Sequence, residues 1–303
     1  MSAVVALPVA FVAEEITPAV MAAPLQIEEV AAVRQWVRDA QSAGARVGFV
    51  PTMGALHAGH TSLVDRARRE CDRVVVSLFV NPTQFSPNED YERYPRPLED
   101  DLRRLEAAGA DAVLLPAVEA IYPPGDATTV DVGSVAMPWE GASRPTHFRG
   151  VATVVTKLFG AVPADRAYFG RKDYQQTVVV RRLVTDLLLP IEIVVCPTVR
   201  EPDGLAMSSR NAYLSPRERQ QALAVPESLE IVERLVTQGE RRVEPLRAAA
   251  LERLDSAEGM EPDYVAFMAD GTVEEVEHLT GPTVVAVAAR VGRTRLIDNR
   301  LLA

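Results

Sequence analysis

The sequence predicts an α/β fold, in which a doubly wound parallel sheet of the Rossmann-like type is followed by a second, smaller α+β domain. Up to about residue 196, apolar strand-like runs alternate with helical patterns through short turns. Strands separated by helices pair in parallel through right-handed crossovers, which builds a doubly wound sheet. After Pro197 the composition changes to a polar loop, two Arg/Glu-rich helical patterns and three β-rich segments. A length of 303 residues fits two such domains.

The alternation begins with a helical pattern over residues 27–44, where apolar residues recur at helical spacing and a glycine stands at the end. A strand at 46–51, a glycine-containing turn and a helix near 62–70 follow. The later elements are expected as a strand at 74–80, a helix entered through Pro97 and closed by Gly109, a strand at 112–116, a helix at 151–158, a strand at 167–170, a helix at 178–188 and a strand at 191–195. Ligands of such sheets bind beyond the carboxyl ends of the strands.

The second part of the chain is predicted to form helices at 217–238 and 243–254 and strands at 263–269, 283–291 and 294–299. Pro226 is expected to interrupt the first of these helices. Residues 1–24 are interpreted as a flexible leader, 25–198 as the first domain and 199–303 as the second. The leader is apolar, but it has no basic stretch and carries two glutamates where a cleavage region would be, so it is not predicted to be a signal peptide.

The amino-acid composition and the net charge exclude some classes of protein and disfavour some partners. The chain is 48% hydrophobic and 24% charged, which excludes a disordered or low-complexity protein. Its formal charge of −10 disfavours nucleic acid and anionic membranes as partners. No run approaches the roughly 18 to 20 apolar residues that span a bilayer. The two cysteines, Cys71 and Cys196, suit a reducing compartment, so a cytoplasmic location is expected.

The candidate chemistry lies in the turn PTMGALHAGH at residues 51–60, directly after the first predicted strand. His57 and His60 stand in this turn, and Gly54 and Gly59 allow a close approach of the backbone. A helix is expected from His60 onward, and its free N–H groups and positive dipole end would attract an anion. The turn is therefore predicted to bind phosphate.

Two other interpretations of this turn remain open. Residues 54–61 match the phosphate-binding loop G-x-x-x-x-G-K-[ST] except that His60 replaces the lysine, and Asn81 stands after the next strand where such proteins place a magnesium-binding aspartate. Zinc binding is the third possibility, because His57 and His60 are three residues apart, but no nearby residue completes a ligand set. The P-loop interpretation gives a P-loop-like phosphotransferase as the alternative enzyme. A nucleotide sensor that binds ATP without catalysis is the alternative that is not an enzyme.

Six segments together resemble the pantothenate synthetase family, which belongs to the wider HxGH nucleotidyltransferase superfamily. They occur in the family's order and spacing, and the resemblance as a whole runs from about residue 27 to residue 299: PTMGALHAGH (51–60), FVNPTQF (79–85), YPRPLEDD (94–101), RPTHFRGVATVV (144–155), FGRKDYQQ (169–176) and REPDGLAMSSRNAYL (200–214). The resemblance implies an ATP-dependent ligase with Mg²⁺. Pantoate and ATP would form a pantoyl-adenylate with release of pyrophosphate, and β-alanine would then displace AMP. It also implies a homodimer.

The resemblance further implies roles for particular residues. Catalysis would fall to His57, His60, Lys172 and Arg210. ATP would be bound by Pro51, Thr52, Met53, Gly59, Gly170, Asp173, Val199, Met207, Ser208 and Ser209, with the ribose hydroxyls donating to Asp173. Pantoate would be bound by Met53, Asn81, Gln84, Arg144 and Gln176.

The residue types are consistent with these roles. A carboxylate that approaches a polyanion needs neutralising charge, and Lys172 is one of only two lysines among 32 basic residues. Gln84 and Gln176 are amides that both donate and accept, which suits hydroxyls and a carboxylate. Asp100 and Asp101 are the candidate magnesium contacts, although two acids at a helix start also suit the helix dipole. Arg171 departs from the family pattern and adds positive charge beside the phosphate site.

Overall fold

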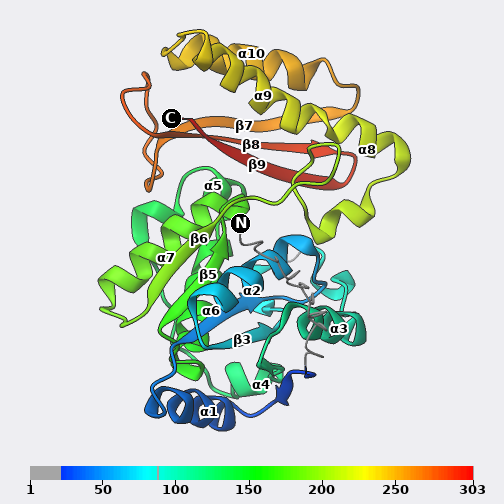
Figure 1. The fold of residues 1–303 in the computed structure, drawn as a ribbon. Coiled ribbons are helices and arrows are strands. Elements are labelled where there is room, and N and C mark those ends of the chain that lie inside the picture. Colours follow the sequence, from blue (N-terminus) through cyan, green and yellow to red (C-terminus); the bar gives the residue numbers. More distant parts are fainter. Residues whose placement is uncertain (1–21, 87–88, 303) are drawn as a thin grey trace, which may run out of the picture.

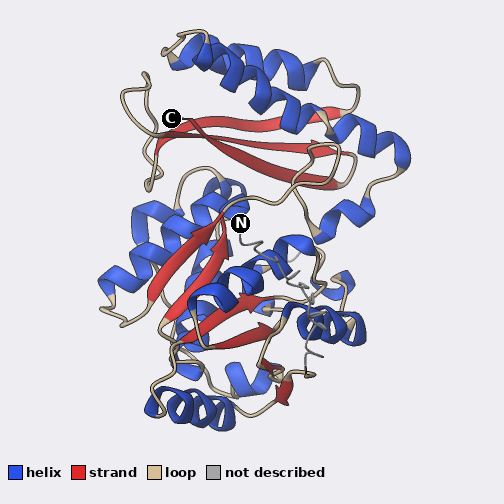
Figure 2. Cartoon of the chain, viewed as in Figure 1, coloured by secondary structure: helices blue, strands red, loops and turns tan. Residues whose placement is uncertain are grey.

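Two sheets organise the chain, as the computed structural model shows for residues 22–86 and 89–302 (Figure 1, Figure 2). The expected leader lies almost wholly outside these described residues. The first sheet has six parallel strands in the order β1-β4-β3-β2-β5-β6. Its strands are β1 Leu25–Ile27, β2 Val47–Thr52, β3 Arg73–Leu78, β4 Ala112–Leu114, β5 Arg166–Gly170 and β6 Glu192–Cys196. From β2 the chain adds β3 and β4 on one side and then crosses to add β5 and β6 on the other side of β2. The topological switch point therefore lies between β2 and β5.

Helices cover both faces of this sheet. One apolar core joins α1, α6 and α7 to the sheet, and the other joins α2 and α3 to its opposite face. The helices are α1 Val30–Ser42, α2 Ala58–Glu70, α3 Leu98–Ala108, α4 Val118–Ile121, α5 Glu140–Ser143, α6 His147–Ala161 and α7 Tyr174–Asp186. Short 3-10 turns lie at Pro82–Gln84, Tyr91–Arg93, Gly133–Ala136 and Arg171–Asp173. This layered arrangement confirms the predicted doubly wound sheet.

The second sheet is antiparallel, in the order β7-β8-β9. Its elements are the 3-10 turn Ser209–Tyr213, the helices α8 Pro216–Ala222, α9 Ala224–Thr237 and α10 Val243–Asp255, and the strands β7 Met260–Ala269, β8 Thr283–Val291 and β9 Thr294–Leu302. In Figure 1, α9 and α10 cover one face of this sheet, with a shared apolar core. The other face contacts Tyr174 and Val178 of α7. The second unit, which is the antiparallel sheet with its helices, therefore packs on the first unit, which is the parallel sheet with its helices.

The structure corrects the predicted start of the chain's regular elements. The helical pattern includes Ile27, but this residue belongs to β1, where it pairs with Leu114, and α1 begins only at Val30. A three-residue edge strand is too short to show a period of its own, so its apolar residue merges with the helical pattern that follows. The helix predicted at 217–238 is interrupted as Pro226 led us to expect: α8 ends at Ala222 and α9 begins at Ala224, which places Pro226 in the first turn of α9, where a backbone N–H is not needed.

The boundary expected at residue 198 falls in the connection between Cys196, which ends β6, and Pro216, which begins α8. It stays a prediction. Across the described ranges, no helix combines the length and the apolar character that crossing a membrane would need.

Candidate active site

A cavity of about 700 Å³ lies beyond the carboxyl ends of the parallel strands, between the two units. Six residues predicted for the site line it: Arg144, Lys172, Asp173, Gln176, Ser208 and Arg210. Residues 294–299 of β9 line it from the second unit. The other predicted residues are not among the lining residues: Pro51, Thr52, Met53, His57, Gly59, His60, Asn81, Gln84, Asp100, Asp101, Gly170, Val199, Met207 and Ser209. His57 and His60 lie near its wall, since the charges of the lining residues Lys172 and Asp173 act on both rings.

The two histidines of the turn after β2 cap the helix that follows them. His57 is the N-cap of α2, and its Nδ1 accepts from the Gly59 N–H at 3.1 Å. The His60 Nδ1 accepts in return from the His57 N–H at 3.3 Å. The two rings lie 4.1 Å apart between centroids. Since each Nδ1 accepts a hydrogen bond, a neutral ring carries its proton on Nε2, and that N–H is the group left to donate to a ligand.

This geometry changes the predicted mode of phosphate binding. The helix start was expected to offer free N–H groups, but the His57 ring accepts the Gly59 N–H and the His57 carbonyl accepts those of His60 and Thr61. Three of the backbone donors at the helix start are thus bonded within the turn, and the Ala58 N–H is the one for which the described residues provide no partner. The imidazole Nε2–H groups are the further donors that this turn presents.

Burial keeps both rings neutral. It lowers the pKa of His57 to about 4, with help from the nearby Lys172 ammonium. Burial lowers the pKa of His60 to about 3, and the neighbouring His57 adds to this shift. At neutral pH the pair therefore offers two neutral donors rather than two cations, and the permanent positive charge comes from elsewhere.

Asp101 holds the shape of the same turn. Its carboxylate accepts from the N–H groups of Ala55, at 2.9 Å, and Leu56, at 2.7 Å. Ala55 and the preceding Gly54 have φ values of 51° and 79°, a left-handed conformation that a non-glycine residue adopts only when its surroundings impose it. Asp101 is 2% exposed, and burial raises the pKa of its carboxyl despite these bonds. Its observed role is to fix the backbone between β2 and the histidines.

The same observation argues against the predicted magnesium contacts. Both oxygens of Asp101 face the turn, while Asp100 is exposed and pairs with Arg103. The two carboxylates therefore do not converge on one point. Within the described residues, no group of three or more His, Cys, Asp or Glu side chains is placed to bind a metal ion. Asp100 and Asp101 do not fit a resident magnesium ion.

Lys172 and Asp173 lie in the 3-10 turn after β5, and both line the cavity. In the part of the chain that the structure describes, the one ion pair of the Lys172 ammonium is a 4.0 Å approach to Asp173. Arg171 has a firmer partner, since its guanidinium pairs with Asp270 at 3.5 Å. The extra charge that Arg171 brings is thus directed to the second unit, whereas Lys172 lies on the cavity wall with only this long approach to Asp173 among the described residues.

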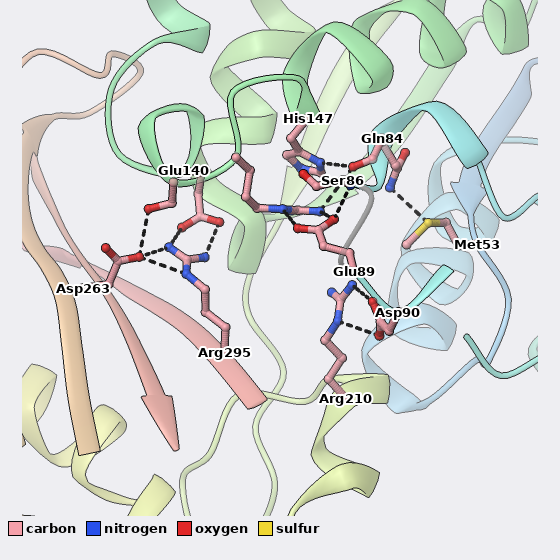
Figure 3. A network of polar contacts seen from close by, with 12 residues as sticks. Met53, Gln84, Ser86, Glu89, Asp90, Glu140, His147, Arg210, Asp263 and Arg295 are labelled. Carbon is pink, nitrogen blue, oxygen red and sulfur yellow. Dashed lines mark hydrogen bonds and ion pairs between the residues drawn. The ribbon is translucent and has the colours of Figure 1, made fainter. Parts of the chain in front are cut away.

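Two acidic residues that sequence reasoning missed pair with two predicted arginines (Figure 3). Arg210 binds Asp90 at 3.0 and 3.2 Å, and Arg144 binds Glu89 at 2.6 and 2.8 Å. Burial opposes the ionisation of both carboxyls, but the guanidinium bonds outweigh it and lower the pKa of each. Glu89 and Asp90 are adjacent in the sequence, and nothing in the local pattern indicates that they face two distant arginines.

The predicted amides form a cluster around the turn Pro82–Gln84. The Gln84 Nε2 lies 3.0 Å from the Met53 sulfur, and the Asn81 Nδ2 donates to Gln84 Oε1 at 3.0 Å. This turn packs so closely on α6 that a Cβ at Gly150 would come within 2.4 Å of the Thr83 carbonyl oxygen. Glycine at 150 therefore allows the turn that carries Gln84 to pack against α6. Gln176 lies apart from this cluster, on the cavity wall.

A third histidine, His147, was not singled out from the sequence. It is 8% exposed, and its Nδ1 lies 3.0 Å from the Gln84 carbonyl oxygen, to which it must donate. Burial and the nearby Arg144 lower its pKa to about 4. His147 thus holds the amide cluster as a neutral donor.

Acid is expected to destabilise the protein through such histidines. Between pH 6.5 and about 4 the unfolded chain binds a proton at His147 and the folded chain does not, so the free energy of unfolding falls as the pH falls, by about 1.4 kcal/mol per pH unit for each such group. His147→Asn keeps a donor to Gln84 and does not titrate. Urea unfolding at pH 7, 6 and 5 should show a shallower fall in this variant, and a slope equal to the wild type would contradict the assignment.

A buried charge network joins the two units on the other side of the cavity (Figure 3). Arg295 of β9 binds Glu140 at 2.6 and 2.7 Å and Asp263 at 2.7 Å. The Tyr264 hydroxyl donates to Glu140 at 2.9 Å. Its residues come from α5, β7 and β9, so no single segment of the sequence could predict this network.

The family of the chain follows from comparison with known proteins. A family model described as pantoate-beta-alanine ligase matches residues 25–301. The chain belongs to the pantoate-beta-alanine ligase family. A pantothenate synthetase of Thermotoga neapolitana is 52% identical over 276 residues, which are 91% of this chain and 99% of that one. One of Geobacter sulfurreducens is 51% identical over 276 residues, which are 91% and 98% of the two chains.

Solved ligases have the same fold. A pantothenate synthetase from Thermus thermophilus matches with a TM-score of 0.85 and 48% identity over 91% of this chain and 98% of that one. A pantoate-beta-alanine ligase from Francisella tularensis, solved with beta-gamma ATP and beta-alanine, matches with a TM-score of 0.74 and 34% identity, and the match covers 92% and 98% of the two chains. The predicted family, fold class and ligase activity are thereby confirmed.

Proposed function

We propose that this chain condenses pantoate with β-alanine in two steps. ATP and pantoate first form a pantoyl-adenylate and pyrophosphate, and the amine of β-alanine then displaces AMP to give pantothenate. The observation that carries this proposal is that Lys172, after β5, lies near enough to the neutral histidine pair, after β2, for its charge to lower the pKa of both rings, in a chain of the pantoate-beta-alanine ligase family. The ATP and beta-alanine bound in the Francisella ligase support both as substrates.

The first step needs charge neutralisation more than proton transfer. A carboxylate oxygen attacks the α-phosphorus, the bond to the β-phosphate oxygen breaks, and negative charge grows on the departing pyrophosphate. Lys172 would bind these oxygens as a point charge, and His57 and His60 would donate from Nε2. Arg210 would leave Asp90 to bind phosphate. Because both rings are neutral, they would stabilise the phosphate oxygens by hydrogen bonds and would keep their protons during the step.

The remaining contacts position the reactants. Met53, Asn81, Gln84, Arg144 and Gln176 are proposed to bind pantoate, and the Met53 side chain would pack on its methyl groups. Asp173 would accept from the ribose, while Ser208 and Ser209 lie on the segment that leads into the cavity with Arg210. Met207 belongs to this segment and lies close to Gly59, where an added Cβ would be 3.7 Å from the Met207 Cβ. The segment therefore reaches the histidine turn.

Further properties are proposed from the family resemblance. Magnesium would arrive with the phosphates of ATP, since Asp100 and Asp101 do not fit it. A homodimer in the cytoplasm is expected, and sedimentation of the purified chain would measure the oligomeric state. Nucleic acid and membranes are not expected partners.

Isotope exchange tests the reaction. Labelled pyrophosphate should enter ATP only when pantoate is present, because exchange needs reversible formation of the adenylate. Addition of β-alanine should then yield pantothenate and AMP. Transfer of the γ-phosphoryl group would favour the phosphotransferase, and ATP binding without either reaction would favour the sensor.

A further inference from the structure

Asn299 belongs to the second unit, but its side chain contacts the turn that carries Lys172. From β9, the Asn299 Nδ2 donates to the carbonyl oxygens of Arg171 and Lys172, both at 2.9 Å. The side chain is buried, with 4% of the residue exposed. One amide group thus holds two successive carbonyls of the turn between β5 and α7.

The turn has no side chain of its own that caps its backbone. It is three residues long, and the start of α7 has no side-chain cap either. A 3-10 turn of this length makes little hydrogen bonding within itself, so its backbone is held from outside. Lys172 is the middle residue of the turn, and a rotation of the flanking peptide planes would move its ammonium group.

Asn299 is itself rigidly placed. Asp298, 2% exposed, receives two bonds from Arg200, at 2.6 and 3.0 Å. The Asn299 N–H donates to Asp298 at 2.7 Å, and β9 pairs with β8 opposite Ala286. The orientation of the amide is also fixed, because the reverse orientation would place its oxygen against two carbonyl oxygens. The position therefore requires a donor.

We propose that Asn299 is a positioning residue for Lys172, through which the second unit sets the direction of the ammonium group in the cavity. The expected effect on the reaction rate rests on the proposed function, whereas the expected effect on the position of the Lys172 side chain does not. The competing explanation is that Asn299 only helps to hold the two units together, but the Glu140–Arg295 pair already joins them without touching this turn.

Lysine labelling tests the positioning directly, because the chain has only two lysines. Protein grown with isotope-labelled lysine gives two sets of lysine signals, which Lys157→Arg and Lys172→Arg variants assign. Asn299→Ala should shift or broaden the Lys172 signals and leave those of Lys157, which lies on α6 and binds the Ile121 carbonyl. Arg300→Ala is the matched control, since Arg300 is the next residue of β9 and pairs instead with α9. Unchanged Lys172 signals in Asn299→Ala would overturn the proposal.

A double-mutant cycle tests the kinetic consequence. Asn299→Ala should lower kcat for pantoate-dependent exchange about 10- to 100-fold, with KM changed less than about threefold, as expected when a reacting group is displaced by a fraction of a bond length. In a Lys172→Ala background the same substitution should change kcat less than about twofold. Multiplicative effects would overturn the proposal in favour of the competing explanation.

The two failures are distinguishable. A wild type without pantoate-dependent exchange refutes the proposed function, and the labelled lysines still decide whether Asn299 positions the turn. If Asn299→Ala does not fold, Asn299→Leu keeps the volume, removes the donor and gives the same two readouts.

Discussion

Lys172→Ala is expected to lower kcat for adenylate formation by about 10²–10³, which corresponds to roughly 2.7–4 kcal/mol of lost transition-state stabilisation. An ammonium 4 Å from a phosphate charge at an effective dielectric of 20 gains about 4 kcal/mol before desolvation, so the Coulomb energy is large enough. The lysine is free to supply it, because its ion pair with Asp173 is 4.0 Å long. Pantoate-dependent exchange and single-turnover formation of the acyl-AMP measure the effect.

Lys157 provides the matched control for this substitution. It is the other lysine of the chain, and its ammonium binds Asp126 at 2.6 Å and stacks over Tyr122. Lys157→Ala should lower stability and leave the exchange rate unchanged. Equal rates in wild type and Lys172→Ala would remove Lys172 from the mechanism.

Substitution of His60 is expected to separate two roles of one ring. The His60 Nδ1 caps the turn, and Nε2 is the proposed phosphate donor. His60→Asn can place an acceptor near the position of Nδ1 and lacks the outer donor, so it should keep the melting temperature and lose about 10²-fold or more in exchange rate.

His60→Gln is the complementary variant. Its amide reaches the position of Nε2 but not that of Nδ1, so it should lose about 1 kcal/mol of stability and retain more activity than the asparagine variant. Thermal melts and the exchange assay on both proteins measure the two effects. A fully active asparagine variant would show that the ring is only a cap, and a glutamine variant as stable as the wild type would show that the cap contributes little to stability.

The sequence was sufficient to predict the ends of an element where residues at those ends favour starting or stopping it. Helix α3 begins at Leu98 after Pro97 and ends at Gly109, which adopts φ 77°, as the sequence predicted. The buried strands and the histidine turn were also found. The helices α6 and α7 begin earlier than predicted, at His147 and Tyr174, because their first turns are held by tertiary contacts rather than by an apolar period, and α7 ends at Asp186, before its predicted end at 188.

The site shows the limit of the same reasoning. Asp101 was expected to contact magnesium, but its carboxylate accepts two backbone N–H groups of a turn more than forty residues away in the sequence. Glu89, Asp90 and Asn299 were not singled out, because each acts on a partner that only folding brings near. A residue type and its spacing indicate what a side chain can donate or accept, and they do not indicate which distant group it meets.

The amino-acid sequence by itself determined the alternation of strands and helices, the histidine turn after a buried strand, and the family, because these are properties of short segments and of their order. The tertiary structure alone decided that the histidines cap their own helix and donate from Nε2, that Glu89 and Asp90 pair with the arginines, and that Asn299 holds the Lys172 turn. These contacts join groups that are adjacent only across the switch point of the sheet or between the two units, where burial rather than spacing sets the charge and the direction of each group.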